Sequence, residues 1–210
     1  MDLVGQIDGL NAEPWLGEAF RASSFRPFFV GNSHYSERLG EEPLYDDSTR
    51  EVIRDHLLDE PQNFYHRLGE MTLGLPRGQI DRAALYDRVG FANLLQFYLR
   101  TPRPQASVRQ LKPYVPAFLA MFDAVDPSHI ILFGEEVWGA FKSDGVLKDE
   151  CHRADDTWSG VIGGRPAFYL CHPASTYADA GWGEYVARWV VEEGVTDAEL
   201  EDWRAAIAVS

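Results

Sequence analysis

Four groups of residues follow short apolar runs in this sequence, and they contain the side chains best suited to chemistry. The groups are Gly31-Asn32-Ser33-His34-Tyr35, Phe91-Ala92-Asn93-Leu94-Leu95, Gly134-Glu135-Glu136 and His172-Pro173-Ala174-Ser175-Thr176-Tyr177. Asn93 offers a donor and an acceptor on one planar amide, which suits recognition of the edge of a nucleobase. His172 has a side chain that transfers protons or stabilises charge near neutral pH. The third group resembles the acidic first turn of a helix, and we assign it no chemistry.

Other kinds of site fit these residues less well. The pairs Cys151-His152 and Cys171-His172 lack the spacing of a zinc site, so we expect no metal and no other cofactor. A serine hydrolase with Ser33 as nucleophile is a weak second interpretation, because the nucleophile elbow needs a glycine where this chain has Tyr35. The glycine-rich loops of dinucleotide-binding and P-loop proteins do not occur.

The apolar patterns predict strands that alternate with helices. Four short apolar runs read as buried strands, at Pro27 to Val30, Val89 to Leu95, His129 to Phe133, and Ala167 to Cys171. Helical patterns lie at Thr49 to Leu58, Val108 to Phe122, and Ala178 to Glu193. Thr196 and Glu199 form a capping box that begins an acidic C-terminal helix at about residues 196–208.

This order of elements predicts an α/β protein, and it indicates where a ligand would bind. We expect one domain over residues 1–210, a three-layer α/β/α sandwich with a four-stranded, mainly parallel central sheet. In such folds ligands bind beyond the carboxyl ends of the strands. The polar groups named above all follow predicted strands, so we expect Asn93 and His172 at the same edge of the sheet.

The composition is that of a folded protein, and its charge is unevenly distributed. The chain has 210 residues, a net charge of −14 and only two cysteines, with no apolar run long enough for a membrane span and no secretory leader. We therefore expect a cytoplasmic protein, and a monomer. Residues 88–122 nevertheless contain no acid, and this stretch is either a solvated face or a surface that contacts phosphates. Its candidate DNA-binding side chains are Arg100, Arg103, Arg109 and Lys112.

The four groups, in their order along the chain, resemble the motifs of the uracil-DNA glycosylase superfamily over residues 28–190. Gly31 to Tyr35 is similar to the first motif, and Asn93 stands where that superfamily has the asparagine that recognises a pyrimidine. The third strand is similar from Asp126-Pro127 to Phe133-Gly134, and His172-Pro173-Ala174-Ser175 resembles the H-P-S motif, whose loop enters the minor groove. The first motif differs in having no carboxylate at position 32 or 33.

The resemblance implies a base-flipping enzyme with assigned roles. His172 would stabilise charge on the departing base, and Asn32, or else Ser33 or His34, would position the attacking water. Base-binding residues would be Asn93, Tyr35, His34, Ser33 and Tyr45, while Ser175, Thr176 and Tyr177 would join the basic residues in contacting DNA. No lysine lies at the strand ends, so no lyase activity is expected.

The substrate that the resemblance implies is single- or double-stranded DNA with a target base. The polar residues 33, 34 and 36–47 favour a modified pyrimidine in foreign (phage) DNA, such as glucosylated hydroxymethylcytosine. The alternatives are a uracil-DNA glycosylase of base-excision repair and a catalytically weak relative that binds DNA. An acidic interaction protein that uses the fold as a scaffold also fits the net charge.

Overall fold

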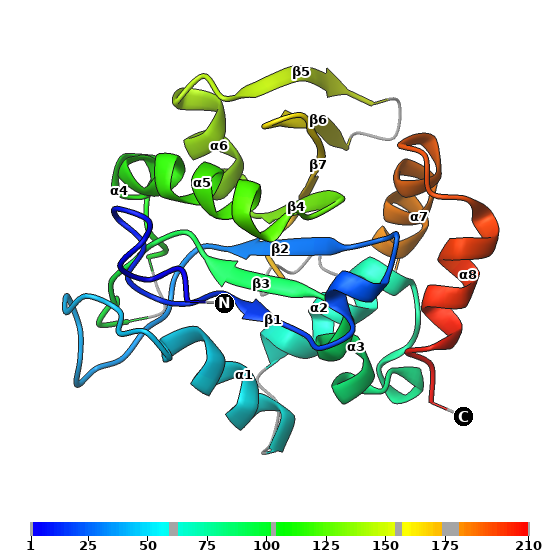
Figure 1. The fold of residues 1–210 in the computed structure, drawn as a ribbon, viewed down its shortest axis with the longest axis horizontal. Helices are drawn as coiled ribbons and strands as arrows, with labels where there is room; N and C mark the ends of the chain where they lie inside the picture. The colour runs from blue at the N-terminus through cyan, green and yellow to red at the C-terminus, as the bar shows by residue number, and fades with distance from the viewer. Residues whose placement is uncertain (1, 59–62, 102–103, 154–156, 174–180, 210) are drawn as a thin grey trace.

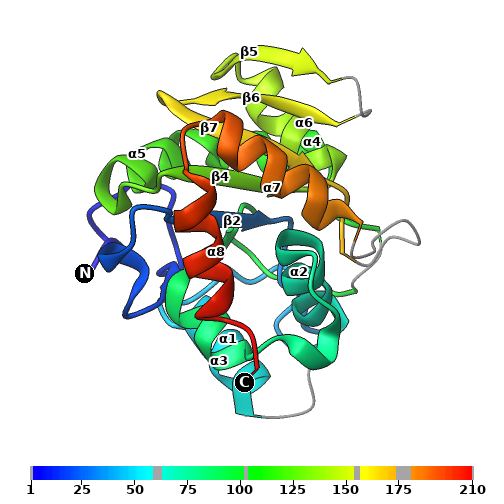
Figure 2. The ribbon, with the colours of Figure 1, turned by 90° about the vertical axis from the view of Figure 1, so that its right-hand side faces the viewer.

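The computed structural model describes residues 2–58, 63–101, 104–153, 157–173 and 181–209, and it shows an α/β fold. A twisted sheet runs through the centre of the molecule, and helices lie on both of its faces (Figures 1 and 2). The α/β class predicted from the sequence is confirmed. Within the described residues, no helix combines the length and the apolar character needed to cross a membrane.

The sheet has seven strands in the order β1-β3-β2-β4-β7-β6-β5, so the predicted count of four is wrong. The strands are β1 (Trp15–Leu16), β2 (Pro27–Gly31), β3 (Gly90–Asn93), β4 (His129–Phe133), β5 (Leu147–His152), β6 (Trp158–Ile162) and β7 (Arg165–Leu170). The neighbours β3, β2, β4 and β7 are parallel, whereas β1, β6 and β5 pair antiparallel. The sheet is therefore mixed.

The three additional strands have weak sequence signals. β1 has two residues, and β5 is a mostly exposed edge strand with a register shift between Lys148 and Cys151. The turn between β6 and β7 is formed by Gly163 and Gly164, with φ angles of 57° and 79°. Positive φ at both positions is the requirement of the tightest hairpin turns, and glycine meets it without strain.

The helices occupy two layers. The α-helices are α1 (Ser48–Leu58), α2 (Asn63–Leu73), α3 (Arg82–Arg88), α4 (Val108–Leu111), α5 (Val115–Val125), α6 (Glu135–Ser143), α7 (Trp182–Glu192) and α8 (Asp197–Ala205), and the 3-10 turns are η1 (Phe20–Ala22), η2 (Arg77–Gln79) and η3 (Lys112–Tyr114). One layer holds α4, α5 and α6, and the other holds α2, α3, α7 and α8 (Figures 1 and 2). The capping box of Thr196 and Glu199 begins α8, as predicted.

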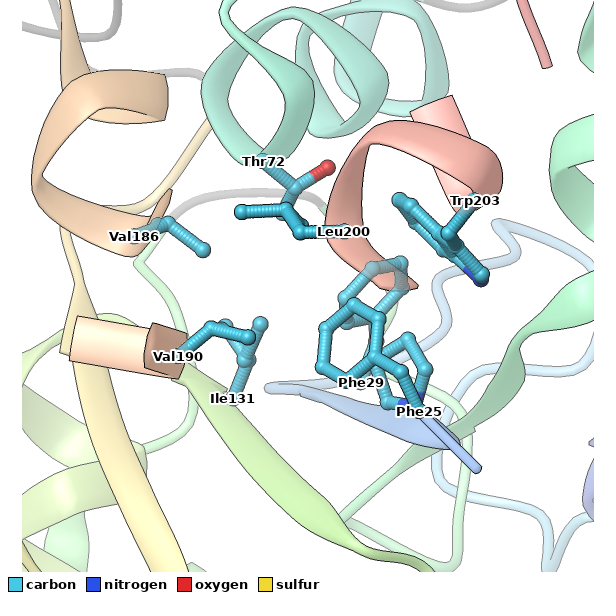
Figure 3. A pocket seen from close by; sticks show the side chains of 9 residues that line it. Phe25, Phe29, Thr72, Ile131, Val186, Val190, Leu200 and Trp203 are labelled. Carbon is cyan, nitrogen blue, oxygen red and sulfur yellow. The ribbon is translucent and has the colours of Figure 1, made fainter. Parts of the chain in front are cut away.

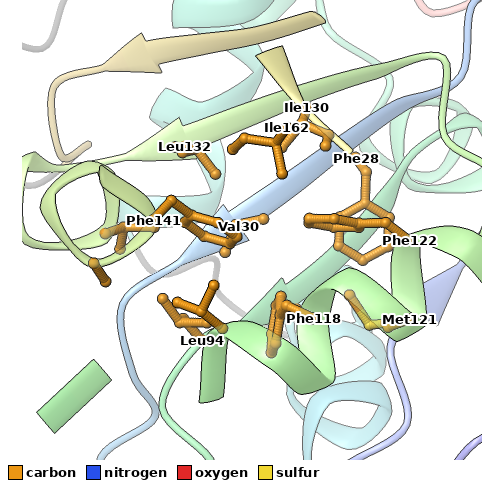
Figure 4. Packing of buried hydrophobic residues seen from close by; sticks show 14 of the residues in the cluster. Phe28, Val30, Leu94, Phe118, Met121, Phe122, Ile130, Leu132, Phe141 and Ile162 are labelled. Atoms are coloured by element: carbon orange, nitrogen blue, oxygen red, sulfur yellow. The ribbon is translucent and has the colours of Figure 1, made fainter. Parts of the chain in front are cut away.

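Each face of the sheet has its own apolar core, because alternate residues of a strand point to opposite faces. On one face Phe28 and Val30 of β2 pack with Phe118 and Phe122 of α5 (Figure 4). On the other face Phe29 of the same strand belongs to a second cluster with residues of α2, α7 and α8. Burial on both faces explains why the central strands read as continuous apolar runs.

A buried carboxylate ties the N-terminal segment to the body of the protein. Glu13 is 4% exposed, and its Oε1 accepts hydrogen bonds from the backbone amides of Leu3 and Val4, the latter at 2.6 Å. Its Oε2 lies 3.4 Å from the guanidinium of Arg50 on α1. These donors compensate a charge that would be costly to bury alone.

Candidate active site at the carboxyl edge of the sheet

The carboxyl ends of the four parallel strands lie at the same edge of the sheet. Gly31 of β2 pairs with Asn93 of β3, and Phe133 of β4 pairs with Leu170 of β7. After β2 the chain continues into α1, α2 and α3, whose residues belong to the apolar core on one face of the sheet. After β4 it continues into α6, whose residues belong to the core on the opposite face. The carboxyl edge between β2 and β4 is therefore a topological switch point, the place where open α/β sheets bind ligands.

At this switch point, the carboxamide of Asn93 lies across the end of β2. A Cβ atom placed on Gly31 would be 2.1 Å from Asn93 Oδ1, so only glycine leaves room for this arrangement. Asn93 is 5% exposed, and within the described part of the chain its carboxamide forms no hydrogen bond. Its backbone carbonyl, in contrast, accepts one from Gln96 at 2.8 Å. Neither polar atom of this amide is among the fully buried atoms that lack a partner, so the side chain can bond to a ligand or to water.

The other side of the switch point holds His172. Gly134, which follows β4, has a φ of 94° that favours glycine, and its backbone amide donates to the carbonyl of Leu170 at 2.8 Å. A Cβ atom on Gly134 would lie 3.6 Å from His172 Cβ and 3.9 Å from His172 Cδ2. Asn93 and His172 are thus at the same edge of the sheet, as expected. The ends of β2, at Gly31, and of β4, which Gly134 follows, lie between them.

The backbone beside His172 is held from α2. Arg67 Nη1 donates a hydrogen bond of 3.1 Å to the carbonyl oxygen of Pro173. Near the end of α2, a Cβ atom on Gly183 of α7 would be 2.0 Å from the backbone nitrogen of Gly74, so α2 and α7 are in close contact. Arg67, which the sequence analysis missed, therefore links a well-packed helix to the residue after His172.

The side chain of Asn32 is bonded to a neighbouring loop. Its Nδ2 donates to the carbonyl of Ala106 at 3.0 Å, and its Oδ1 accepts from the amide of Ala106 at 3.0 Å. Asn32 is 3% exposed. This reciprocal pair gives Asn32 a structural role that its sequence context does not reveal. The role of positioning water, predicted for Asn32 from the family resemblance, stays a prediction.

The remaining residues predicted to bind the base lie on the segment between β2 and α1. His34 is buried, its Nε2 lies 3.3 Å from Thr49 Oγ1, and burial lowers its pKa to about 4. The neutral ring therefore fastens the loop to α1. Tyr35 and Tyr45 are both about half exposed, and the hydroxyl of Tyr45 donates to the carboxylate of Glu51. Ser33 is half-buried, with no hydrogen-bond partner for its hydroxyl among the residues that the structure describes.

The predicted DNA-binding residues differ in their surroundings. Arg100 Nε lies 3.4 Å from Glu41, and both side chains are exposed. Lys112 donates to the carbonyl of Ser143 at 2.8 Å. Arg109 is exposed on α4, without an acidic partner in the described ranges. Arg103, Ser175, Thr176 and Tyr177 lie outside the described residues.

Two acidic residues occupy the helix start at the switch point. Glu135 and Glu136 are the first residues of α6, and Glu136 Oε2 would be 3.7 Å from a Cβ atom on Gly134. On the adjacent strand β7, burial first, and then the charges of Glu135, Cys171 and Glu136, raise the pKa of Tyr169 to about 12. A helix start can bind phosphate through its backbone amides, but here the carboxylates of Glu135 and Glu136 would repel an anion.

Other parts of the described chain offer less for binding. No cluster of three or more metal-ligating side chains is present among the described residues, and neither Cys151 nor Cys171 is part of a disulfide. A cavity of about 10 Å³ beneath α2, α7 and α8 is lined by apolar side chains and by Thr72 (Figure 3). It has room for about one water molecule. Its position within the apolar core separates it from the strand ends.

Comparisons with known proteins add no identification. No protein-family model matches the chain, and no curated protein sequence is significantly similar to it.

Proposed function

We propose that this protein is a monofunctional DNA glycosylase, which flips a pyrimidine out of DNA and hydrolyses its N-glycosidic bond to leave an abasic site. The observation that carries the proposal is the buried, unbonded carboxamide of Asn93 beside the glycine end of β2, with His172 beside Gly134 on the neighbouring side of the switch point. In this proposal Asn93 recognises the edge of the base and His172 supports the leaving group.

Asn93 and His172 have complementary roles in this proposal. The amide of Asn93 donates to and accepts from the edge of the flipped base. Cleavage leaves negative charge on the base, and His172 stabilises that charge. Such a contact contributes on the order of 3–4 kcal/mol in the transition state. The half-exposed Tyr35 or Tyr45 stacks on the base.

The proposed substrate is a modified pyrimidine in foreign DNA, with glucosylated hydroxymethylcytosine as the leading example and uracil in repair as the alternative. DNA is negatively charged and the protein has a net charge of −14, so the two repel each other overall. Binding therefore depends on a local surface of basic side chains. Arg109 is the best of these, because no acid pairs with it in the described ranges. Arg109→Ala should weaken binding to every sequence and flatten the log–log salt dependence by about one unit.

A DNA-binding relative with little activity is the second candidate. The observation that favours it is the bonding of the Asn32 amide to Ala106, which leaves the first motif without a free amide or carboxylate for water. If this candidate is right, the protein binds DNA, the binding requires Arg109, and no abasic product is formed.

A cleavage assay separates these candidates. Single- and double-stranded oligonucleotides that contain uracil, hypoxanthine, hydroxymethylcytosine or glucosylated hydroxymethylcytosine are incubated with excess protein, and abasic sites are scored by alkaline cleavage. We expect one of these bases to be released, and His172→Ala to slow the chemical step by roughly 10²–10³-fold without loss of DNA binding. Unimpaired cleavage by His172→Ala would refute the mechanism, and no cleavage of any DNA would favour the binding protein.

A further inference from the structure

Glu136 is a carboxylate close to His172, one of the two proposed site residues. Its Oε2 and the ring atom Cδ2 of His172 both lie within 4 Å of the position that a Gly134 side chain would occupy. The absence of a side chain at Gly134 thus opens one space that both groups border. Glu136 is half-buried, and its carboxylate forms no hydrogen bond or ion pair with the residues that the structure describes.

The position of Glu136 suits a reaction that develops positive charge. Carboxylates at a helix N-terminus gain about 0.3–1 kcal/mol from the dipole, and Glu135 and Glu136 share this benefit. Glu136 is partly buried whereas Glu135 is exposed, and Glu136 Oε2 borders the space beside His172. A helix start used for phosphate would not carry two negative charges. The side of the ligand that faces α6 is therefore neutral or cationic.

We propose that Glu136 is a further catalytic residue, which holds the attacking water and offsets positive charge on the deoxyribose. This inference rests on the proposed glycosylase function. The C1′–N bond breaks and both of its electrons leave with the base, whose negative charge His172 stabilises. The oxygen of the water forms the new bond to C1′, and one water proton passes to the Glu136 carboxylate. The departing base takes up a proton from solvent, and Glu136 returns its own.

This role replaces a group that the first motif lacks. Position 32 is an asparagine whose amide is bonded to Ala106, and position 33 is a serine. The carboxylate of Glu136, on the helix after β4, lies at the same edge of the sheet as the first motif, which follows β2. The site then contains Asn93 for the base, His172 for the leaving group and Glu136 for the sugar and water.

The chain supplies a matched control for this inference. Glu135→Gln removes the same charge from the same helical turn, but at the exposed carboxylate, so Glu136→Gln and Glu135→Gln should have similar effects on thermal stability. In single-turnover cleavage of the preferred DNA, we expect Glu136→Gln to slow the reaction roughly 10²-fold, Glu136→Asp to recover part of the rate, and Glu135→Gln to remain near wild type.

A second measurement reports on charge without cleavage. DNA with a cationic pyrrolidine in place of the target sugar mimics the transition state, and DNA with a neutral tetrahydrofuran is its control. Glu136→Gln should weaken binding of the cationic analogue about tenfold or more and change binding of the neutral analogue little.

The outcomes distinguish this inference from the proposed function. If the wild-type protein releases no base from any DNA, the glycosylase proposal fails, and Glu136 with it as a catalytic residue. If the wild-type protein cleaves but Glu136→Gln and Glu135→Gln cleave at equal rates, or bind the cationic analogue equally, only the role of Glu136 is refuted. If Glu136→Gln does not fold, Glu136→Asp is compared with Glu135→Asp instead: a folded Glu136→Asp that cleaves as fast as Glu135→Asp refutes the role.

Discussion

Adding one methyl group at Gly31 should slow the proposed reaction about 10²-fold without unfolding the protein. In the structure, a Cβ atom at this position would lie 2.1 Å from Asn93 Oδ1 and 3.3 Å from its Cγ. Real Cβ contacts essentially never fall below 3.0 Å, so the carboxamide of Asn93 must retreat by at least about 0.9 Å. A misplacement of about 1 Å in a catalytic site can cost about 10²-fold in rate.

The stability cost of Gly31→Ala should be small. Overpacking a buried site costs about 1–3 kcal/mol, while replacing glycine in a strand offsets about 0.5–1 kcal/mol of this through chain entropy. The assay is single-turnover release of the preferred base together with thermal unfolding. Gly78→Ala is the matched control, because Gly78 has no atoms within 4 Å of its would-be Cβ and no positive φ. A Gly31→Ala rate within about threefold of wild type would refute the placement of Asn93 at the reacting base.

Three further predictions concern residues that hold the site in place. Asn32→Ala should lower the free energy of unfolding by about 2–4 kcal/mol in urea titrations, because two buried hydrogen bonds are lost and their backbone partners stay unbonded. Burial lowers the pKa of His34 from about 6.5 to about 4, so the contribution of this one residue to stability should fall by roughly 1.4 kcal/mol per pH unit as the pH falls from about 6.5 to about 4. His34→Gln should show a shallower slope in the same titration. Arg67→Gln should slow base release about tenfold in the wild-type background but little in His172→Ala, and equal losses in both backgrounds would show that Arg67 does not act through His172.

The central strands could be predicted from the sequence because both of their faces are buried. The runs that end at Gly31 and Phe133 became β2 and β4 almost residue for residue. Two-sided burial produces an uninterrupted apolar run, which is a strong signal. The edge strand β5 carries Lys148, Asp149 and Glu150 and leaves most of its residues exposed, so it has no comparable pattern. Its pairing with β6 is decided by tertiary contacts.

The candidate site could be predicted only in outline. The rule that ligands bind at the carboxyl ends of parallel strands placed Asn93 and His172 at one edge, and the structure agrees. The partner of Asn32 is 74 residues away, and no local pattern indicates it. The sequence around Glu136 indicates only an ordinary acidic helix start, because the proximity of Glu136 to His172 depends on how β4 and β7 pair. Sequence patterns report burial well, but they do not report which distant side chains meet.

The buried carboxylate of Glu13 makes the first residues of the chain structural rather than dispensable. Shortening the protein past Val4 would remove two backbone donors and leave the carboxylate with only the ion pair to Arg50. Hydrogen bonds to charged groups each contribute about 1.5–3 kcal/mol, a substantial share of the stability of a typical domain. Arg50 belongs to α1, which also holds His34 through Thr49. Proteolytic trimming at the N-terminus would therefore loosen the loop beside the candidate site, and an affinity tag is better joined elsewhere.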